Sequence, residues 1–350
     1  MNSAENDSEL SKFPKWQKLE QKLKYHAMSY FDGESLFQYS QCSEICNAEI
    51  RKFDTDVPYI LKLEEVSGGV SVKLTMKNKQ YGTLYEVQSK FVDLENGTHS
   101  WERCSIPRYL QVMQENPDFR ASSARNFQLS ENFVYHGDSM TGAVKYLEQR
   151  FRNSEKRGKP FRIHLKFKKW PYQLSSFLKK FLDVNLTIDM NQAVYEGFMD
   201  MAAQDAPENM NLIFARTEML KNSFCIPSAF FKSTIFKNLQ SFNCDLPTEM
   251  TDRDFFESKA TNLKIYSTMI TDKAIKQKID KWLKVGGKEL KFQIFGTYRN
   301  SSNCRDIVKN LRLYRKNDFT YDLMGTGITA NFKCVEGFVS FEGKKNIALA

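Results

Sequence analysis

The chain has 350 residues, which is enough for about two domains. Hydrophobic residues make up 41% of the chain and charged residues 27%, a globular composition that argues against a disordered protein. No apolar run approaches the roughly 20 residues of a membrane-spanning helix, and the polar, acidic start predicts no secretory signal. We therefore expect an intracellular protein, cytoplasmic or nuclear.

Seven cysteines are scattered through the chain without any Cys-X-X-Cys pair, and the four histidines lie far apart. Cys42 and Cys46 are four residues apart, but no nearby residue completes a set of metal ligands. The pattern predicts reduced thiols. We expect no metal and no cofactor.

Residues 1–12 are polar and are predicted to be a disordered tail. Residues 13–52 have a helical pattern, since Leu19, Leu23 and Ala27 recur at steps of four and Gly33 stands where the first helix should stop. Further apolar positions around Leu36 and from Cys42 onward predict two more short helices. A three-helix unit this small is marginal alone and usually docks on a partner or a neighbouring domain.

Residues 53–138 are predicted to form an antiparallel β-meander with loops. The runs VPYILKLEEV, VSVKLTM and YGTLYEV are rich in β-formers and are separated by turn residues such as Gly68 and Gly69. Residues 93–137 have an irregular sequence, so we expect loops there, with a helix over 108–114.

Residues 139–350 contain a repeating unit. Short apolar strands are expected to begin near Phe161, Leu186, Leu212, Leu239, Leu263 and Leu290, at intervals of 24 to 27 residues, with a weaker strand near Leu311. Helical segments lie between them, the clearest beginning after Thr271 and ending at Val285. This spacing is typical of a leucine-rich-like β–α solenoid with a parallel sheet on its concave face. An ordinary α/β sandwich is the competing interpretation.

Alternation along these strands predicts which side chains face outward. Leu263, Ile265, Leu290, Phe292 and Ile294 should point into the core. The open face should mix charged and aromatic groups, as in surfaces that capture a peptide or protein. Its predicted target-binding residues are Lys166, Lys168, Asp189, Lys264, Tyr266, Lys291, Gln293, Arg312 and Tyr314. Polar alternation on any one-sided sheet would give the same pattern without a binding role.

The positive charge is concentrated in one segment. Of the formal net charge of +9, residues 145–180 alone carry +10. Within this segment Phe161 to Trp170 alternates apolar and basic residues, which predicts a strand with one cationic face. That face could bind an acidic peptide, a phosphorylated degron or nucleic acid, or could be an ordinary solvated surface.

No catalytic motif is found. The sequence has no GxSxG, HExxH, Walker or GxGxxG pattern, and Gly158-Lys159 and Gly287-Lys288 lack the P-loop spacing. We expect a protein without enzymatic activity.

The two ends of the chain together resemble the nematode F-box proteins that carry a C-terminal F-box-associated domain. The stretch from Phe13 to Phe53 is similar to a divergent F-box, although Leu19-Glu20 stands where the family usually has Leu-Pro. The stretch LKIYSTMITDKAIKQKIDKWLKVGGKELKFQIF resembles the associated domain through Leu263, Ile270-Thr271-Asp272, Lys281-Trp282-Leu283, Gly286-Gly287 and Leu290.

This resemblance implies a substrate-recognition adaptor of a Skp–cullin–F-box ubiquitin ligase. The N-terminal helices would bind the Skp-type adaptor protein and the C-terminal domain would bind a target protein. The implied adaptor-binding residues are Phe13, Pro14, Trp16, Leu19, Leu23, Met28, Leu36, Tyr39 and Cys42. Two alternatives remain open: a scaffold protein that has lost its ligase coupling, and a nucleic-acid binder that uses the basic segment.

Overall fold

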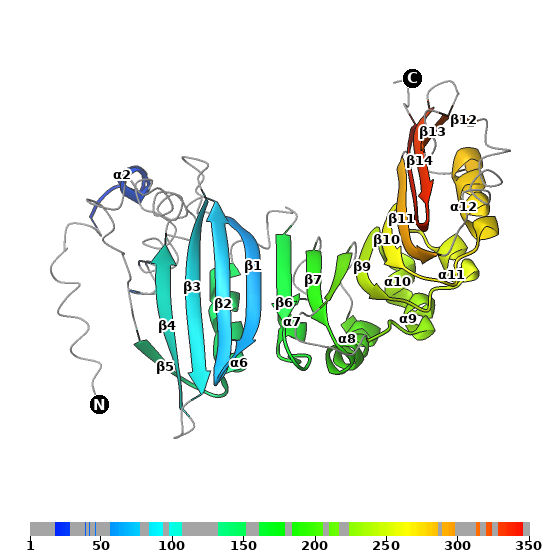
Figure 1. The fold of residues 1–350 in the computed structure, drawn as a ribbon. Coiled ribbons are helices and arrows are strands. Elements are labelled where there is room, and N and C mark those ends of the chain that lie inside the picture. Colours follow the sequence, from blue (N-terminus) through cyan, green and yellow to red (C-terminus); the bar gives the residue numbers. More distant parts are fainter. Residues whose placement is uncertain are drawn as a thin grey trace, which may run out of the picture. The chain divides into compact units, whose positions relative to one another are not determined.

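The protein is a mixed α/β protein in a computed structural model (Figure 1). Contacts divide it into two units, residues 1–61 with 71–156, and residues 62–70 with 157–350. The structure describes residues 18–28, 39, 42, 46, 57–77, 84–93, 98–106, 132–151, 161–178, 184–205, 210–216, 224–285, 289–297, 313–315, 320–323 and 328–345. Among these residues, no helix has both the length and the apolar character needed to cross a membrane.

The first unit is built on a strongly twisted set of β-strands with a helix packed on it. Its elements are α2 (Gln21–Met28), β1 (Val57–Val66) up to Leu61, β2 (Gly69–Lys77) from Ser71, β3 (Leu84–Asp93), β4 (Thr98–Ile106), β5 (Asn132–His136) and α6 (Ser139–Phe151). Strands β3, β4 and β5 pair antiparallel in chain order, and the strand order continues from β3 to β2. The predicted β-rich runs are thus confirmed as strands over 57–66, 70–76 and 84–87, and residues 81–83 of the third run lie outside the described residues.

Helix α6 is fixed to β3 at both its start and its middle. Asp138 Oδ1 accepts a hydrogen bond from Thr141 N at 2.6 Å, which satisfies a free amide of the first turn. Asp93 at the end of β3 accepts hydrogen bonds from both the backbone amide and the hydroxyl of Ser139. Tyr146 then packs on Phe91 with ring centroids 5.7 Å apart. These contacts place α6 with the first unit.

The expectation of loops over 93–137 is wrong in two places, because β4 and β5 lie within this stretch. The sequence of β4, THSWERCSI, does not alternate regularly between apolar and polar residues, so its pattern alone does not predict a strand. Pairing with β3 and β5 on its two sides decides its conformation. The helix expected over 108–114 lies outside the described residues.

The second unit alternates strands with helices and then ends in an antiparallel meander. Its elements are β6 (Phe161–Lys166), α7 (Leu174–Leu178), β7 (Val184–Met190), α8 (Gln192–Asp205), β8 (Asn211–Arg216), α9 (Ser228–Lys232), α10 (Thr234–Asn238), β9 (Ser241–Pro247), α11 (Asp252–Glu257), β10 (Asn262–Tyr266), α12 (Asp272–Val285), β11 (Glu289–Thr297), β12 (Leu313–Arg315), β13 (Thr320–Leu323), β14 (Ile328–Val335) and β15 (Gly337–Lys345). The strands expected from the repeat spacing are all present, each within about three residues of its expected start.

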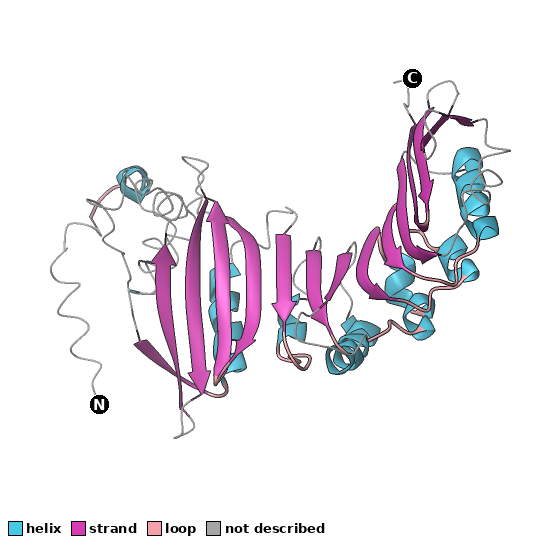
Figure 2. Ribbon diagram, in the orientation of Figure 1, coloured by secondary structure: helices cyan, strands magenta, loops and turns pink. Residues whose placement is uncertain are grey.

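Strands β6 to β11 are parallel and follow one another in chain order, after which β15, β14, β13 and β12 continue the sheet antiparallel. The segment of β1 from Lys62 lies on the other side of β6. Helices α8 to α12 cover one side of these strands (Figure 2).

The core of the second unit lies between the strands and these helices and is rich in phenylalanine. Phe198 of α8 packs edge-on against Phe214 of β8, and Phe236 of α10 packs against Phe242 of β9. Toward the end of the chain Trp282 of α12 packs against Phe341 of β15 at 5.5 Å. The residues predicted to point inward, Leu263, Ile265, Leu290, Phe292 and Ile294, are all buried. The opposite face of the sheet carries the alternating polar positions.

The expectation of reduced thiols throughout is wrong at Cys334. This residue of β14 is disulfide-bonded, and its partner is outside the described side chains. Cys42, Cys46, Cys225 and Cys244 are not disulfide-bonded, as predicted. No motif in the sequence marks Cys334 for pairing, because disulfide partners are set by the fold and not by local spacing.

Candidate protein-binding face

The candidate site is the face of the second-unit sheet that the helices leave uncovered. Strand register aligns its side chains in rows across the sheet. The first row runs Arg162, Asn185, Asn211, Ser241, Asn262, Lys291 and Glu342. The second runs His164, Thr187, Ile213, Asn243, Lys264, Gln293 and Ser340. Because neighbouring strands are hydrogen-bonded in register, these rows form a mainly polar surface that Ile213 interrupts on β8.

Hydrogen bonds between amide side chains link neighbouring strands in the first row. Asn211 Nδ2 donates to Asn185 Oδ1 at 2.8 Å, and Asn262 Nδ2 donates to Ser241 Oγ at 3.0 Å. These groups satisfy one another, so this part of the face is structural.

Lysines on this face are paired with carboxylates. Lys264 Nζ lies 2.7 Å from Asp245 Oδ1 on the neighbouring strand, and Lys291 Nζ lies 3.6 Å from Glu342 Oε2. All four side chains are substantially exposed, so each pair contributes little to stability. Their main effect is to leave this part of the surface without a strong net charge.

Two lysines of the basic segment predicted to form a cationic surface are paired with carboxylates. Lys166 Nζ lies 2.7 Å from Glu64 Oε1, and Glu65 accepts a hydrogen bond from the Lys168 backbone amide at 2.8 Å as well as pairing with its ammonium at 3.5 Å. Both acids come from β1, about a hundred residues earlier in the chain. This arrangement weakens the case for an anionic partner at these two lysines.

His164 and Asp189 form a further pair on adjacent strands. His164 Nε2 lies 2.9 Å from Asp189 Oδ1, and the carboxylate is largely buried while the imidazole is half-exposed. The pair satisfies the buried carboxylate, and no third catalytic group is placed beside it by the contacts of the described residues.

An aromatic strip, Tyr266, Phe295 and Phe338, crosses the face at the carboxyl ends of β10 and β11. The three residues are Cα partners on adjacent strands. Tyr266 and Phe295 are stacked with an interplanar angle of 7°, and Phe295 and Phe338 have centroids 4.8 Å apart. Tyr266 is 45% exposed, and Met269 just after it is 50% exposed. Phe295 and Phe338 are half-buried, so Tyr266 is the most exposed ring of the strip, and exposed aromatic side chains are enriched at protein interaction sites.

The backbone around the aromatic strip is rigidly held. Thr248 donates two hydrogen bonds to the Tyr266 carbonyl, from its amide at 2.7 Å and from its hydroxyl at 2.9 Å. The Ser267 amide donates to the Phe295 carbonyl at 3.0 Å. Gly296 has φ +85°, and a Cβ there would lie 2.8 Å from Tyr266 Cε1. Only glycine provides both this conformation and the space for the ring.

The structure brings together some of the predicted target-binding residues. Lys264 and Gln293 are register partners, and Tyr266 and Lys291 lie on the same two strands. Lys166, Lys168 and Asp189 share the face but lie on or just after β6 and β7, several strands away. Tyr314 is in β12, although its side chain is not described, and Arg312 lies outside the described residues.

Phe295 and Phe338 were missed by the sequence reasoning. Phe295 follows Lys291 and Gln293 in strict alternation, so the pattern that placed those two on the open face should have placed it there too. Phe338 could not be found this way, because its position depends on the antiparallel register of β15 against β11.

The predicted adaptor-binding residues are described only in part. On α2 and just before it, Leu23 is 53% exposed and Leu19 is 37% exposed, whereas Met28 is buried. Tyr39 is half-buried and Cys42 is exposed, and both are helical. Phe13, Pro14, Trp16 and Leu36 lie outside the described residues.

Cys225 and Cys244 of the second unit are poor nucleophiles. Burial raises the pKa of Cys244 to about 12, and burial followed by the charge of Glu249 raises the pKa of Cys225. Both side chains therefore remain thiols at neutral pH, and the thiolate is the reactive form. Nor do the described side chains include a group of three or more His, Cys, Asp or Glu suited to holding a metal ion.

Comparison of the chain with protein families, with curated proteins and with solved structures finds no match.

Proposed function

We propose that this chain is a non-catalytic adaptor that binds two proteins through two separate surfaces. One surface is formed by the leucines of the N-terminal helical region in the first unit. The other is the uncovered sheet face of the second unit. In this proposal the first surface binds the Skp-type adaptor of a cullin–RING ubiquitin ligase and the second holds the protein to be ubiquitinated.

The observation that carries the proposal is the exposure of Leu19 and Leu23. In helix α2, with the sequence QKLKYHAM, Met28 is buried in the core whereas Leu23 is left exposed, so Leu23 contributes little to the packing of its own chain. Leu19 lies just before the helix and Leu23 lies in its first turn, so both exposed leucines stand at the start of α2, where they offer apolar surface to a groove of a partner. The family resemblance of residues 13–53 names that partner class.

A target-recognition role for the second unit is supported by its layout. Parallel strands that follow one another in chain order, with helices on one side, leave a rigid sheet face with its side chains aligned. We propose a leucine-rich-like solenoid for this unit rather than a sandwich, because the uncovered face is polar and aromatic. The N-terminal three-helix F-box unit is likewise part of the proposal.

The disulfide at Cys334 bears on the proposed intracellular location. Structural disulfides persist mainly in oxidising compartments, whereas a ubiquitin ligase operates in the reducing interior of the cell. Free-thiol labelling of the protein purified from cytosol under alkylating conditions shows whether Cys334 is reduced or disulfide-bonded in the cell. A labelled Cys334 agrees with the proposal, and a fully protected Cys334 speaks against it.

Co-expression of the full chain with a Skp-type adaptor protein tests the ligase coupling. We expect a complex that survives affinity purification and is lost with Leu23→Asp, because a carboxylate would have to be buried in the apolar interface. Tyr172→Asp is the matched control, since Tyr172 is 61% exposed in the second unit. Recovery of the folded chain without the adaptor would contradict the ligase coupling and favour the alternative of a scaffold protein that has lost it.

A further inference from the structure

We infer that the aromatic strip Tyr266, Phe295 and Phe338 is the centre of target binding, and that it takes an uncharged, extended protein segment with apolar side chains at positions i and i+2. This inference rests on the proposed target-binding role of the second unit. It specifies the chemical class of the segment that the unit recognises.

The geometry of the strip sets the size of the ligand. Its residues lie on three adjacent strands, so the strip extends about 10 Å across the sheet at the usual strand spacing. Side chains on one face of an extended segment repeat about every 7 Å. Two such side chains therefore fit on the strip, one on each side of the Phe295 ring.

The surrounding charges select against a charged ligand. Lys264 is already paired with Asp245, and Lys291 with Glu342. On β14 and in the turn that follows it, Lys333 and Glu336 are both exposed and carry opposite charges. An acidic segment would meet as many carboxylates as ammonium groups, and so would a basic one. Burial of apolar surface is the driving force that remains.

Preorganisation makes the strip suitable for specific binding. The Tyr266 backbone is fixed by hydrogen bonds from Thr248, and the Tyr266 ring packs closely against the Gly296 backbone. Lys264 Nζ also lies over the Phe295 ring, 5.9 Å from its centroid, which helps to hold this ring in place. A rigid aromatic cluster with a polar rim loses little entropy when it binds, as in the energetic centres of protein interfaces.

Selection from a displayed library of random peptides tests this inference. The full chain serves as bait, the Tyr266→Ala chain is used for counter-selection, and enriched peptides are synthesised and titrated by fluorescence anisotropy. We expect peptides with two apolar residues in i, i+2 spacing and no net charge, whose affinity changes less than about twofold between 0.05 and 0.5 M NaCl. Tyr266→Ala should weaken binding about tenfold or more, and Tyr266→Phe should retain it.

Tyr172→Ala is the control for a non-specific loss of an exposed ring, and circular dichroism checks that each variant is folded. Enrichment of acidic or basic peptides with steep salt dependence would overturn the inference. So would peptides that bind the Tyr266→Ala chain equally well, or a library that yields no enrichment. None of these results depends on Leu19 or Leu23. A failure of peptide binding can therefore be distinguished from a failure of adaptor binding.

Discussion

Gly296 determines where the Tyr266 ring lies, and its replacement is a direct test of the aromatic strip. Gly296→Ala forces an L-residue into positive φ and drives a methyl group against the ring. We expect a loss of about 2–3 kcal/mol in unfolding free energy, measured by urea denaturation. Gly337→Ala is the matched control, because Gly337 shares the positive φ but has open space around it. Equal losses in the two variants would show that the ring contact has no role.

Lys278 of α12 is a buried amine. It donates a hydrogen bond to the Ser258 carbonyl at the end of α11 and lies 5.6 Å from the Phe255 centroid. Burial, followed by the charge of Lys281, lowers the pKa of Lys278 to about 8 from its ordinary value of 10.5. The folded protein therefore releases this proton at a lower pH than the unfolded chain does.

Lys278 should consequently add stability as the pH rises between about 8 and 10.5, since over this range its amine keeps its proton in the unfolded state and loses it in the folded state. Above about pH 9 the buried Cys244 thiol acts in the opposite direction, because its pKa is raised to about 12 in the folded protein. The full gain from Lys278 is about 3 kcal/mol. Urea unfolding at pH 7.5, 8.5 and 9.5 measures it. Lys278→Met should remove the rise between pH 7.5 and 8.5, where the Cys244 thiol is largely protonated in both states, while Lys273→Met at an exposed position of the same helix should keep it. A rise that survives Lys278→Met would contradict this assignment.

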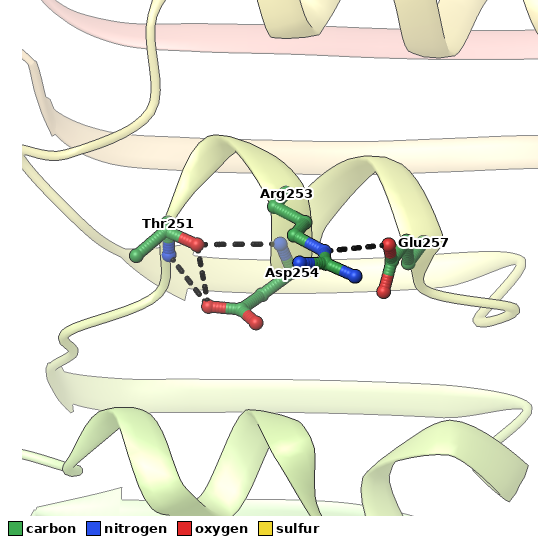
Figure 3. Close-up of polar contacts among 4 residues, drawn as sticks. All are labelled: Thr251, Arg253, Asp254 and Glu257. Atoms are coloured by element: carbon green, nitrogen blue, oxygen red, sulfur yellow. Dashed lines mark hydrogen bonds and ion pairs between the residues drawn. The ribbon is translucent and has the colours of Figure 1, made fainter.

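At the scale of single elements, α11 shows how a short helix is held at its start. Thr251 Oγ1 accepts a hydrogen bond from the Asp254 amide, and the Asp254 carboxylate accepts one from the Thr251 amide at 3.0 Å (Figure 3). This reciprocal capping box satisfies amides that a helix of six residues cannot pair internally.

Thr251→Ala should lower the unfolding free energy by about 1 kcal/mol, and Thr251→Ser should restore most of it. Arg253→Ala provides a comparison on the same helix. Arg253 Nε pairs with Glu257 Oε1 at 2.8 Å but is fully exposed, so its removal should have no measurable effect. Chemical denaturation of the three variants measures their unfolding free energies and checks that Thr251→Ala causes the largest loss. A larger loss in Arg253→Ala than in Thr251→Ala would contradict it.

The elements that the sequence predicts well are those whose periodicity reflects one buried face. Leu263, Ile265, Phe292 and Ile294 alternate with polar residues, and their strands lie where expected. The same logic fails for β4, whose conformation depends on its two neighbours. It also fails to find Glu64 beside Lys166, because chain-distant pairs depend on which strands become neighbours in the sheet.

On the scale of the whole molecule, a net charge of +9 does not by itself indicate an anionic partner. The lysines of the basic strand are held by Glu64 and Glu65, so we expect no binding to a DNA or RNA duplex at about 0.15 M salt. Fluorescence anisotropy with a labelled duplex measures this. Glu64→Gln with Glu65→Gln should release the two lysines and increase binding. Wild-type binding that falls steeply with salt and weakens with Lys166→Ala would favour the nucleic-acid alternative.

The two proposed surfaces belong to different units of the chain, so each should work without the other. Substitutions at Leu19 and Leu23 should leave peptide binding at Tyr266 unchanged, and substitutions at Tyr266 should leave adaptor binding unchanged. Independence of this kind is what a bridging protein needs, because its task is to raise the local concentration of one partner near another.

The mass of the purified full chain mixed with a Skp-type adaptor, measured by light scattering after size exclusion, tests the central claim most directly. At about 10 µM of each protein we predict a single one-to-one complex, which requires a dissociation constant in the micromolar range or below. The Leu23→Asp chain should elute separately from the adaptor. Two separate peaks from the folded wild-type chain and the adaptor would contradict the account.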